Sequence, residues 1–531
     1  MVVPELRPWQ AARPHVVRIA GAVRPRLVRA ATAVRPRVAR LAQAVRPRVA
    51  RTLRPKTWQY TAGAATAGLA LAAGVVTATG PWDSTGQRTA ERDWAAARES
   101  TGGADHGRGS GTSDTEAGVP RPAPSALSVL TGVGGGANTV KSAPGGKSVA
   151  DVLDPLLEDA ALGARHTAVV VDMGTGKRLY GTGADDALTP ASTTKIATAV
   201  AALSAMGADH RFTTRVAFEP DTKELVLVGG GDPTLTARKD AQGWASLREL
   251  AADTAAALKK RGLAKVTLSY DTTLFAGSAL HPIGVNDNIA RVSALVADEG
   301  RTDDSTSGPA PRVADPAADA TRRFGEFLKS AGITTTPPGP SKATSRAATL
   351  ATVSSPPLST MVERMLTNSD NDIAEALARQ TAVATGARAD FAGGGKAILA
   401  QLKKLALPVS GAGFKDGSGL NREDRLTADL LTALLVEAGD PTHPELRPVL
   451  TGLPVAGFTG TLTDRYTQGA AGVVRAKTGT LTGVNTLAGT VVDQDGRLLA
   501  FAFLTADTTD PTAAQSALDR TATALAECGC G

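Results

Sequence analysis

Cysteine is almost absent from this chain, because Cys528 and Cys530 are the only two among its 531 residues. This scarcity excludes a core held together by disulfides, and it excludes a zinc site built from paired cysteines. A disulfide between the two would close a strained ring over a single intervening residue. Three alternatives therefore exist for the two cysteines: an exposed pair of thiols, a bridge to another molecule and an internal disulfide.

Histidine is also sparse, and its six scattered copies form no H-E-x-x-H motif, so we predict neither a catalytic metal nor a cofactor. Ser418 in "DGSGLN" lacks the first glycine of the G-x-S-x-G motif, which argues against a histidine-based triad. The segment "GGKS" at 145–148 resembles the end of a phosphate-binding loop, but Lys141 occupies the position of its first glycine. These absences exclude the commonest serine hydrolase and nucleotide-binding motifs.

Positive charge is concentrated in the first 56 residues, which hold fourteen Arg and Lys against the single acid Glu5. Since the whole chain carries a net charge of +7, the remainder is slightly acidic. The motif "AVRPR" recurs from residues 22, 33 and 44, and its prolines disfavour a long helix. No aromatic residues alternate with the arginines. We therefore expect anionic lipid or a cytoplasmic protein as the partner of this tail, and not nucleic acid.

One long uncharged stretch follows the basic tail, at residues 58–80. It is long enough to cross a bilayer as a helix, and aromatic residues stand at both of its ends. We predict an uncleaved signal anchor in the cell membrane, with 1–57 as a cytoplasmic tail and the body outside. The alternatives are a buried core helix and a signal peptide cleaved after Ala78. The Gly- and Ser-rich residues 81–147 are expected to form a disordered linker.

From residue 148 onward the pattern is that of a folded α/β protein. Residues 166–183 predict two strands joined by a glycine turn, and 193–207 predict a helix. Further expected elements, by residue range, are helices at 244–262, 361–385, 427–438 and 512–526, and strands at 264–271, 471–479, 485–496 and 497–506. An antiparallel sheet built from both ends of this region, with a helical block between them, accounts for the order.

Three short motifs carry the chemistry: "STTK" at 192–195, "SDN" at 369–371 and "KTGT" at 477–480. Each alone fits an ordinary helix cap, turn or strand end. Together and in this order they predict an acyl-transfer site. Lys195 lies one helical turn from Ser192 and can act as its base, provided that it is buried and neutral.

The other two motifs supply the remaining groups of such a site. Ser369 offers a hydroxyl to pass a proton, and Asn371 offers an amide to hold the base or a substrate carbonyl. Lys477 would supply the positive charge that keeps Lys195 neutral.

The strand motif is also suited to bind an anionic substrate. Lys477 and the hydroxyls of Thr478 and Thr480, on either side of Gly479, would bind a carboxylate. The backbone N–H groups of Ser192 and Thr480 would form an oxyanion hole.

These motifs, with "GGGDPTL" at 229–235 and "DGSGLNRED" at 416–424, resemble the D-alanyl-D-alanine carboxypeptidase/endopeptidases called low-molecular-mass class C penicillin-binding proteins. The resemblance extends over about residues 149–526. It implies an α/β (α+β) sandwich of the penicillin-binding protein/β-lactamase type, or transpeptidase-like fold, with an inserted domain. The expected divisions are 148–214 and 346–531 for the transpeptidase-like domain and 215–345 for the insert.

The resemblance also suggests two substrate contacts. In the family an acidic residue of the insert meets the free amino group of the peptide's diamino acid, and Asp287 in "GVNDN" is at the matching position. Arg422 falls at a family position that lines the same cleft. The family's Pro-Gly-Trp before the acidic position is absent, and residues 297–324 replace most of the second part of the insert.

The function implied is that of a serine DD-peptidase that acts on peptidoglycan stem peptides and is acylated by penicillin and other β-lactam antibiotics. A β-lactamase or esterase of the same fold is one alternative, and fast β-lactam turnover would favour it. A non-catalytic scaffold that binds the cell wall is the other. The complete set of Ser192, Lys195, Ser369, Asn371 and Lys477 argues against it.

Overall fold

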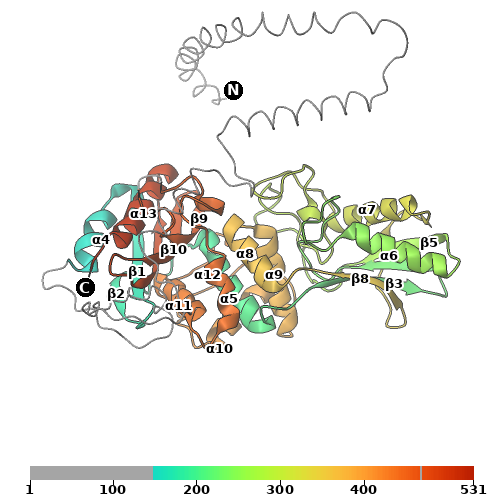
Figure 1. Ribbon diagram of the computed structural model, residues 1–531, viewed down its shortest axis with the longest axis horizontal. Helices are drawn as coiled ribbons and strands as arrows, with labels where there is room; N and C mark the ends of the chain where they lie inside the picture. The colour runs from blue at the N-terminus through green and yellow to red at the C-terminus, as the bar shows by residue number, and fades with distance from the viewer. Residues whose placement is uncertain (1–146, 467–468, 531) are drawn as a thin grey trace, which may run out of the picture. The chain divides into compact units, whose positions relative to one another are not determined.

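Residues 147–466 and 469–530 are described by a computed structural model (Figure 1). Its first sheet has five antiparallel strands in the order β2-β1-β11-β10-β9. By residue bounds these strands are β1 (Arg165–Asp172), β2 (Arg178–Thr182), β9 (Arg475–Leu481), β10 (Val484–Val492) and β11 (Leu498–Ala506). Because β1 pairs with β11, the first and last parts of the folded region share one sheet.

Apolar side chains of β1 point alternately to the two faces of this sheet, and helices cover both faces. Val170 belongs to one apolar core with α4 (Val149–Leu157) and α13 (Pro511–Ala526). Val169 points the opposite way and belongs to a second core with α5 (Thr194–Met206). Since successive side chains of a strand face opposite sides, an apolar run of this kind is suited to a sheet buried between helices.

A block of helices covers the face of the sheet that carries α5. Ile196, Val200 and Leu203 of α5 are all fully buried, so this helix lies inside the block and holds Lys195 within the core. The other helices of the block are α8 (Leu358–Asn368), α9 (Asn371–Ala384), α10 (Phe391–Lys404), α11 (Ala428–Gly439) and the short α12 (Pro448–Thr451).

A second sheet is built from the middle of the chain and has its own core, which includes Leu227, Leu250 and Phe324. Its strands run in the order β6-β5-β4-β3-β8, and β7 pairs with β5. The elements are β3 (Thr213–Glu219), β4 (Glu224–Val228), α6 (Leu247–Lys260), β5 (Lys265–Asp271), α7 (Pro316–Ser330), β6 (Thr334–Thr335), β7 (Gly339–Pro340) and β8 (Ala348–Ser354).

The structure confirms the mixed α/β architecture and the sheet formed from the two outer parts of the folded region. The second sheet spans 213–354, whereas the insert was expected at 215–345. One helical region differs from the prediction in detail. The stretch 361–385 is two helices, α8 and α9, because the chain turns at Ser369 with a left-handed φ of 57°.

The predicted tail (1–57), anchor (58–80) and nearly all of the linker lie outside the described residues. Among the residues that the structure describes, no helix combines the length and the apolar character needed to cross a membrane.

Cys528 and Cys530 form a disulfide just after α13, and both are buried in the core that contains Val170. Neither an exposed thiol pair nor a bridge to another molecule is therefore present. The sequence did not indicate this burial because no apolar pattern surrounds the two residues.

Candidate active site

Ser192 lies in a single 3-10 turn, η2 (Ala191–Thr193), directly before α5. Lys195 is in the first turn of α5 and is fully buried. Its Nζ donates a hydrogen bond to Ser192 Oγ at 2.9 Å. The structure thus brings the predicted nucleophile and base into contact.

Lys195 Nζ also donates to Asn371 Oδ1 and to the carbonyl oxygen of Ser418, each at 2.7 Å. An ammonium group has three N–H donors, and all three are used. Two acceptors come from the predicted motifs, whereas the Ser418 carbonyl was not expected.

The SDN motif forms the joint between α8 and α9. Ser369 ends α8, and the Asp370 carboxylate caps α9 by accepting from the N–H of Ile373 at 3.0 Å. This sharp turn directs Asn371 to Lys195. The motif is therefore a helix cap and a source of site residues at once.

Lys477 lies on β9 and is fully buried. Its Nζ donates to Ser369 Oγ at 2.9 Å and to the Thr478 carbonyl at 2.7 Å. The second lysine is therefore connected to the SDN motif through Ser369, as the first is connected through Asn371.

Gly479 allows β9 to lie directly against the turn that carries Ser192. A β-carbon at this position would overlap Thr486 Oγ1 and would lie 2.7 Å from the Pro190 carbonyl oxygen. Glycine is thus required at this place by close approach of the backbone.

The side chains of the three motifs open onto one cleft of about 360 Å³. Ser192, Ser369, Asn371, Thr478 and Thr480 line it. The two lysines lie buried behind these residues. Segments that are far apart in the sequence therefore meet in a single polar cleft.

Asp287 and Arg422, the two predicted substrate contacts, are exposed, and neither lines this cleft. Asn288, next to Asp287, does line it, and the Asn288 carbonyl accepts from Asn371 Nδ2 at 3.0 Å. Arg422 donates to the carbonyl of Thr482, between β9 and β10, at 2.6 Å. Substrate contact by Asp287 and Arg422 stays a prediction.

Burial lowers the pKa of both lysines. For Lys195, desolvation outweighs the opposing effect of Asp416 and Glu375, and its pKa falls to about 8. Desolvation and then the repulsion of Lys195 hold the pKa of Lys477 well below its usual range. Lys477 has hydroxyl and carbonyl acceptors but no carboxylate partner. Its expected fixed positive charge therefore depends on an anion bound beside it.

A buried group of His281, Glu375 and Asp416, which we call the Asp416 cluster, lies behind Lys195. Its ligand-type atoms lie within 4.8 Å of one another, the spacing of a metal site. However, all four carboxylate oxygens already accept hydrogen bonds from N–H groups. The carboxylates of the cluster therefore serve as hydrogen-bond acceptors for N–H groups of the protein. Sequence reasoning missed it because its members lie far apart in the chain.

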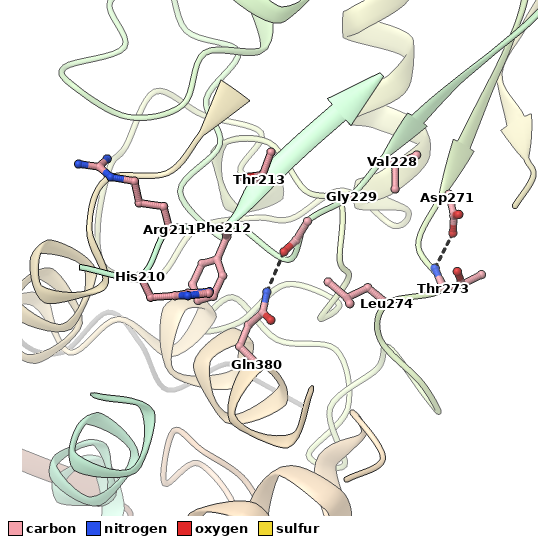
Figure 2. A pocket seen from close by; sticks show the side chains of 11 residues that line it. His210, Arg211, Phe212, Thr213, Val228, Gly229, Asp271, Thr273, Leu274 and Gln380 are labelled. Carbon is pink, nitrogen blue, oxygen red and sulfur yellow. Dashed lines mark hydrogen bonds between the residues drawn. The ribbon is translucent and has the colours of Figure 1, made fainter. Parts of the chain in front are cut away.

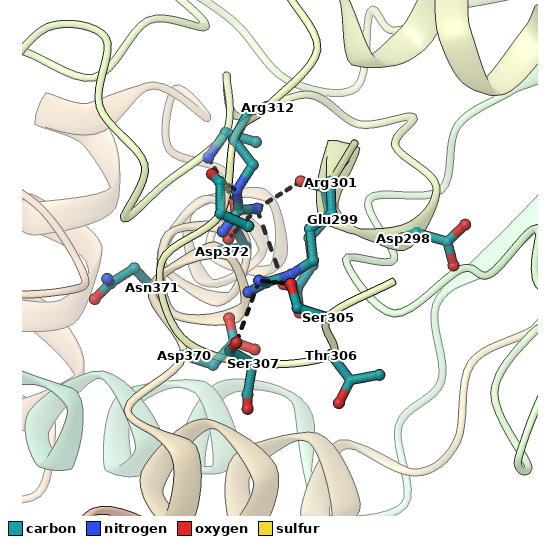
Figure 3. A network of polar contacts seen from close by, with 12 residues as sticks. Asp298, Glu299, Arg301, Ser305, Thr306, Ser307, Arg312, Asp370, Asn371 and Asp372 are labelled. Atoms are coloured by element: carbon teal, nitrogen blue, oxygen red, sulfur yellow. Dashed lines mark hydrogen bonds and ion pairs between the residues drawn. The ribbon is translucent and has the colours of Figure 1, made fainter. Parts of the chain in front are cut away.

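One wall of the cleft comes from the segment 298–312, where the sequence departs from the family pattern. Arg312 Nη1 donates to Asp372 Oδ2 at 2.8 Å and to the Glu299 carbonyl at 2.6 Å (Figure 3). Arg301 Nε donates to Glu299 Oε2 at 2.7 Å. Burial, reinforced by nearby carboxylates, raises the pKa of Glu299 to about 9. The contact between Arg312 and Asp372 connects this wall to the start of α9.

A larger and more open cavity of about 500 Å³ lies between the insert and α9 (Figure 2). Gln380 donates to the Gly230 carbonyl at 2.7 Å, and Asp271 accepts from the N–H of Thr273 at 2.8 Å. None of the predicted site residues lines it. Its buried polar groups hold the surrounding loops, so we assign it no catalytic role.

The fold and the cleft define a class of protein: a hydrolase whose serine is paired with a buried lysine instead of a histidine, on an antiparallel sheet covered by helices. The D-Ala-D-Ala carboxypeptidase 3 (S13) family matches residues 149–311 and 299–525. The chain belongs to this family, which confirms the resemblance of its motifs. It is a D-Ala-D-Ala carboxypeptidase, a peptidase of the hydrolase class.

Relatives support this assignment over most of the folded region. The chain is 36% identical over 403 residues to carboxypeptidase DacB of Mycolicibacterium smegmatis, covering 73% of this chain and 86% of that protein. It is 31% identical over 428 residues to a D-alanyl-D-alanine carboxypeptidase of an Actinomadura species, covering 65% and 79%. Penicillin binding protein 4 of Haemophilus influenzae shares the fold, with a TM-score of 0.58 at 21% identity, covering 70% of this chain and 98% of that one.

Proposed function

We propose that this carboxypeptidase hydrolyses peptidoglycan stem peptides ending in D-Ala-D-Ala through an acyl-enzyme formed on Ser192. The observation that carries the proposal is the 2.9 Å contact between Ser192 Oγ and Lys195 Nζ at a polar cleft. The Actinomadura relative, named a D-alanyl-D-alanine carboxypeptidase, supports the substrate class. Penicillin-type β-lactams would acylate the same serine, and a β-lactam complex of the Haemophilus influenzae protein supports this.

Acylation begins when Ser192 Oγ attacks the carbonyl carbon of the D-Ala-D-Ala bond and neutral Lys195 takes the hydroxyl proton. The backbone N–H groups of Ser192 and Thr480 stabilise the oxyanion that forms. The C–N bond then breaks, and the proton passes through the Ser369 hydroxyl to the leaving amine. In the second step Lys195 accepts a proton from water, whose oxygen attacks the ester carbonyl carbon. The bond between this carbon and Ser192 Oγ then breaks, and Lys195 returns the proton to Ser192 Oγ as the shortened peptide leaves.

The carboxylate of the terminal D-Ala explains why the site has two lysines. Thr478 and Thr480 line the cleft above Lys477, which has no carboxylate partner of its own. A substrate carboxylate bound there favours the charged form of Lys477. That charge in turn lowers the pKa of Lys195, so the base becomes neutral when substrate is in place. Substrate binding thus prepares the nucleophile.

We also propose that the enzyme is anchored in the cell membrane by a single span at 58–80, with its catalytic part outside. The uncharged stretch that follows an arginine-rich tail supports this topology. The basic tail would then contact anionic lipid or a cytoplasmic partner.

Asp287 and Arg422 are proposed to contact outer parts of the substrate, and the position of Asn288 in the cleft lining supports this for Asp287.

The decisive experiment is labelling with a fluorescent penicillin. Wild-type protein should form a covalent adduct that survives denaturation, and Ser192→Ala should form none while keeping its thermal unfolding profile. Labelling of Ser192→Ala at the wild-type rate would refute the proposal. Release of hydrolysed penicillin at many turnovers per second would instead identify a β-lactamase, because a DD-peptidase keeps its acyl-enzyme for a long time.

A further inference from the structure

The Ser418 carbonyl is an acceptor of Lys195 that none of the three motifs supplies. It belongs to the loop 416–419, which lies directly on the turn that carries the nucleophile. A β-carbon at Gly419 would overlap the carbonyl oxygen of Ala191. Thr198 of α5 also donates to the Gly417 carbonyl at 2.6 Å. The position of this loop therefore determines where the third acceptor of Lys195 lies.

Two buried carboxylates hold the loop. Asp416 accepts from the backbone N–H groups of Ser418 at 3.1 Å, Gly419 at 2.7 Å and Asn421 at 2.6 Å. Glu375 accepts from the N–H of Ser418 at 2.9 Å. Glu375 lies one helical turn after Asn371 on α9. One helix thus presents both an acceptor of Lys195 and a support of the loop that provides another.

His281 approaches the same loop from the inserted domain. Its Nε2 lies 3.0 Å from Asp416 Oδ2, and the N–H of Ile283 donates to its Nδ1 at 3.3 Å. Because Nδ1 is an acceptor, the ring proton is on Nε2, and neutral His281 donates to Asp416. The imidazole is only 2% exposed and packs edge-on against Phe391, with ring centroids 5.0 Å apart. Its orientation is therefore fixed on both sides.

We propose that His281 is a positioning residue through which the inserted domain holds the general base. The connection runs from the His281 ring to the Asp416 carboxylate, from there to the backbone of Ser418, and from the Ser418 carbonyl to Lys195 Nζ. The insert is thus part of the catalytic machinery as well as a wall of the cleft. This inference rests on the proposed roles of Ser192 and Lys195.

Loss of the His281 donor should act on Lys195 in two ways. The loop loses one of its restraints, so the Ser418 carbonyl shifts. The Ser418 carbonyl also favours the charged form of Lys195, because it accepts a hydrogen bond from its Nζ, so a displaced carbonyl lowers the pKa of Lys195. The other groups that face Lys195 are Ser192, Asn371, Asp370, Glu375, Asp424 and Lys477. Among them, Glu375 Oε1 lies 3.8 Å from His281 Nε2, so a substitution at His281 also acts on Glu375.

The test compares His281→Phe, which keeps a ring but has no donor, with His281→Gln, whose amide occupies the place of Nε2–H. The rate of acylation by a fluorescent penicillin is measured over a range of pH, with kcat and KM for an acyl-D-Ala-D-Ala peptide. We expect His281→Phe to lose at least about tenfold in acylation rate and in kcat at unchanged KM. Its acid limb should move to lower pH, and His281→Gln should restore the wild-type profile.

The same exchange at an exposed histidine, His210→Phe, serves as the matched control and should behave as wild type. If His281→Phe does not fold, His281→Asn replaces it, because its shorter amide does not reach Asp416. A folded His281→Phe with the wild-type rate at every pH would overturn the inference. So would equal losses in the Phe and Gln variants with an unchanged pH profile, which would indicate packing alone. Labelling of Ser192→Ala would instead refute the proposed function.

Discussion

At the scale of single residues, the chemistry depends on how burial shifts the charge of a few groups. Lys195 can accept a proton only when it is neutral, and its pKa is about 8. Lys477 is buried without a carboxylate and is charged when an anion lies beside it. The pair therefore gives a base that is available near neutral pH and responds to the substrate.

The first prediction concerns the pH dependence of acylation. At low β-lactam concentration the second-order rate constant of acylation reports the enzyme without a bound anion. It should rise through about pH 8, as the neutral fraction of Lys195 grows, and then level off. Lys195→Ala should lower the rate by about 10²- to 10⁴-fold and remove this rise. Stopped-flow measurement with a β-lactam that does not titrate in this range checks both. A wild-type rate independent of pH would exclude Lys195 as the base.

Asp424 gives a second prediction, in which the stability of the fold falls as pH rises. Burial beside Asp416 raises the pKa of Asp424 to about 10, whereas an unfolded Asp titrates near about 3.9. The folded state therefore keeps a proton that the unfolded chain releases, and stability falls as pH rises between these values. Asp424→Asn keeps one donor and one acceptor and should remove this loss.

Urea unfolding checks this expectation. The free energy of unfolding of Asp424→Asn should exceed that of the wild type at about pH 8, and the gain should shrink toward about pH 4. A gain of the same size at both pH values would contradict the assignment of a protonated Asp424.

At the scale of elements, the site exists because β9 lies against the turn of Ser192. Gly479→Ala should force these two elements apart, since the new β-carbon meets Thr486 Oγ1 and the Pro190 carbonyl. We expect a loss of stability of about 1–3 kcal/mol, together with slower acylation of the molecules that remain folded. Thermal unfolding and penicillin labelling measure the two effects. Gly339→Ala, where a β-carbon would meet no atom within 4 Å, is the matched control.

At the scale of the whole molecule, contacts between residues close in the sequence were predictable, and contacts between residues far apart in the sequence were not. Ser192 and Lys195 lie one helical turn apart, so their contact follows from the spacing. The meeting of His281 with Asp416 joins residues 135 positions apart, and no local signal announces it. The range 361–385 was predicted as one helical segment, although a helix cap or turn was one interpretation of the SDN motif. The structure has this cap at Asp370, after a left-handed Ser369.

Membrane topology provides the prediction for the full chain. Protease added to intact cells should remove the catalytic part and leave a protected fragment that contains the basic tail and residues 58–80. Epitopes placed at the two ends of the chain would follow each part by immunoblot. A mature protein that begins just after Ala78 would show cleavage of a signal peptide and would contradict an anchor.

The pairing of β1 with β11 also determines when activity can appear. Arg165 lies opposite Ala506, so the sheet closes only after nearly all of the folded region has been made. Contacts between such distant parts of a chain form late, because a long loop must be ordered before they contribute. Ser192 is synthesised long before Lys477, and until β9 docks there is no second lysine and no cleft. The emerging chain therefore has no complete site until β9 has been made and has paired with β10.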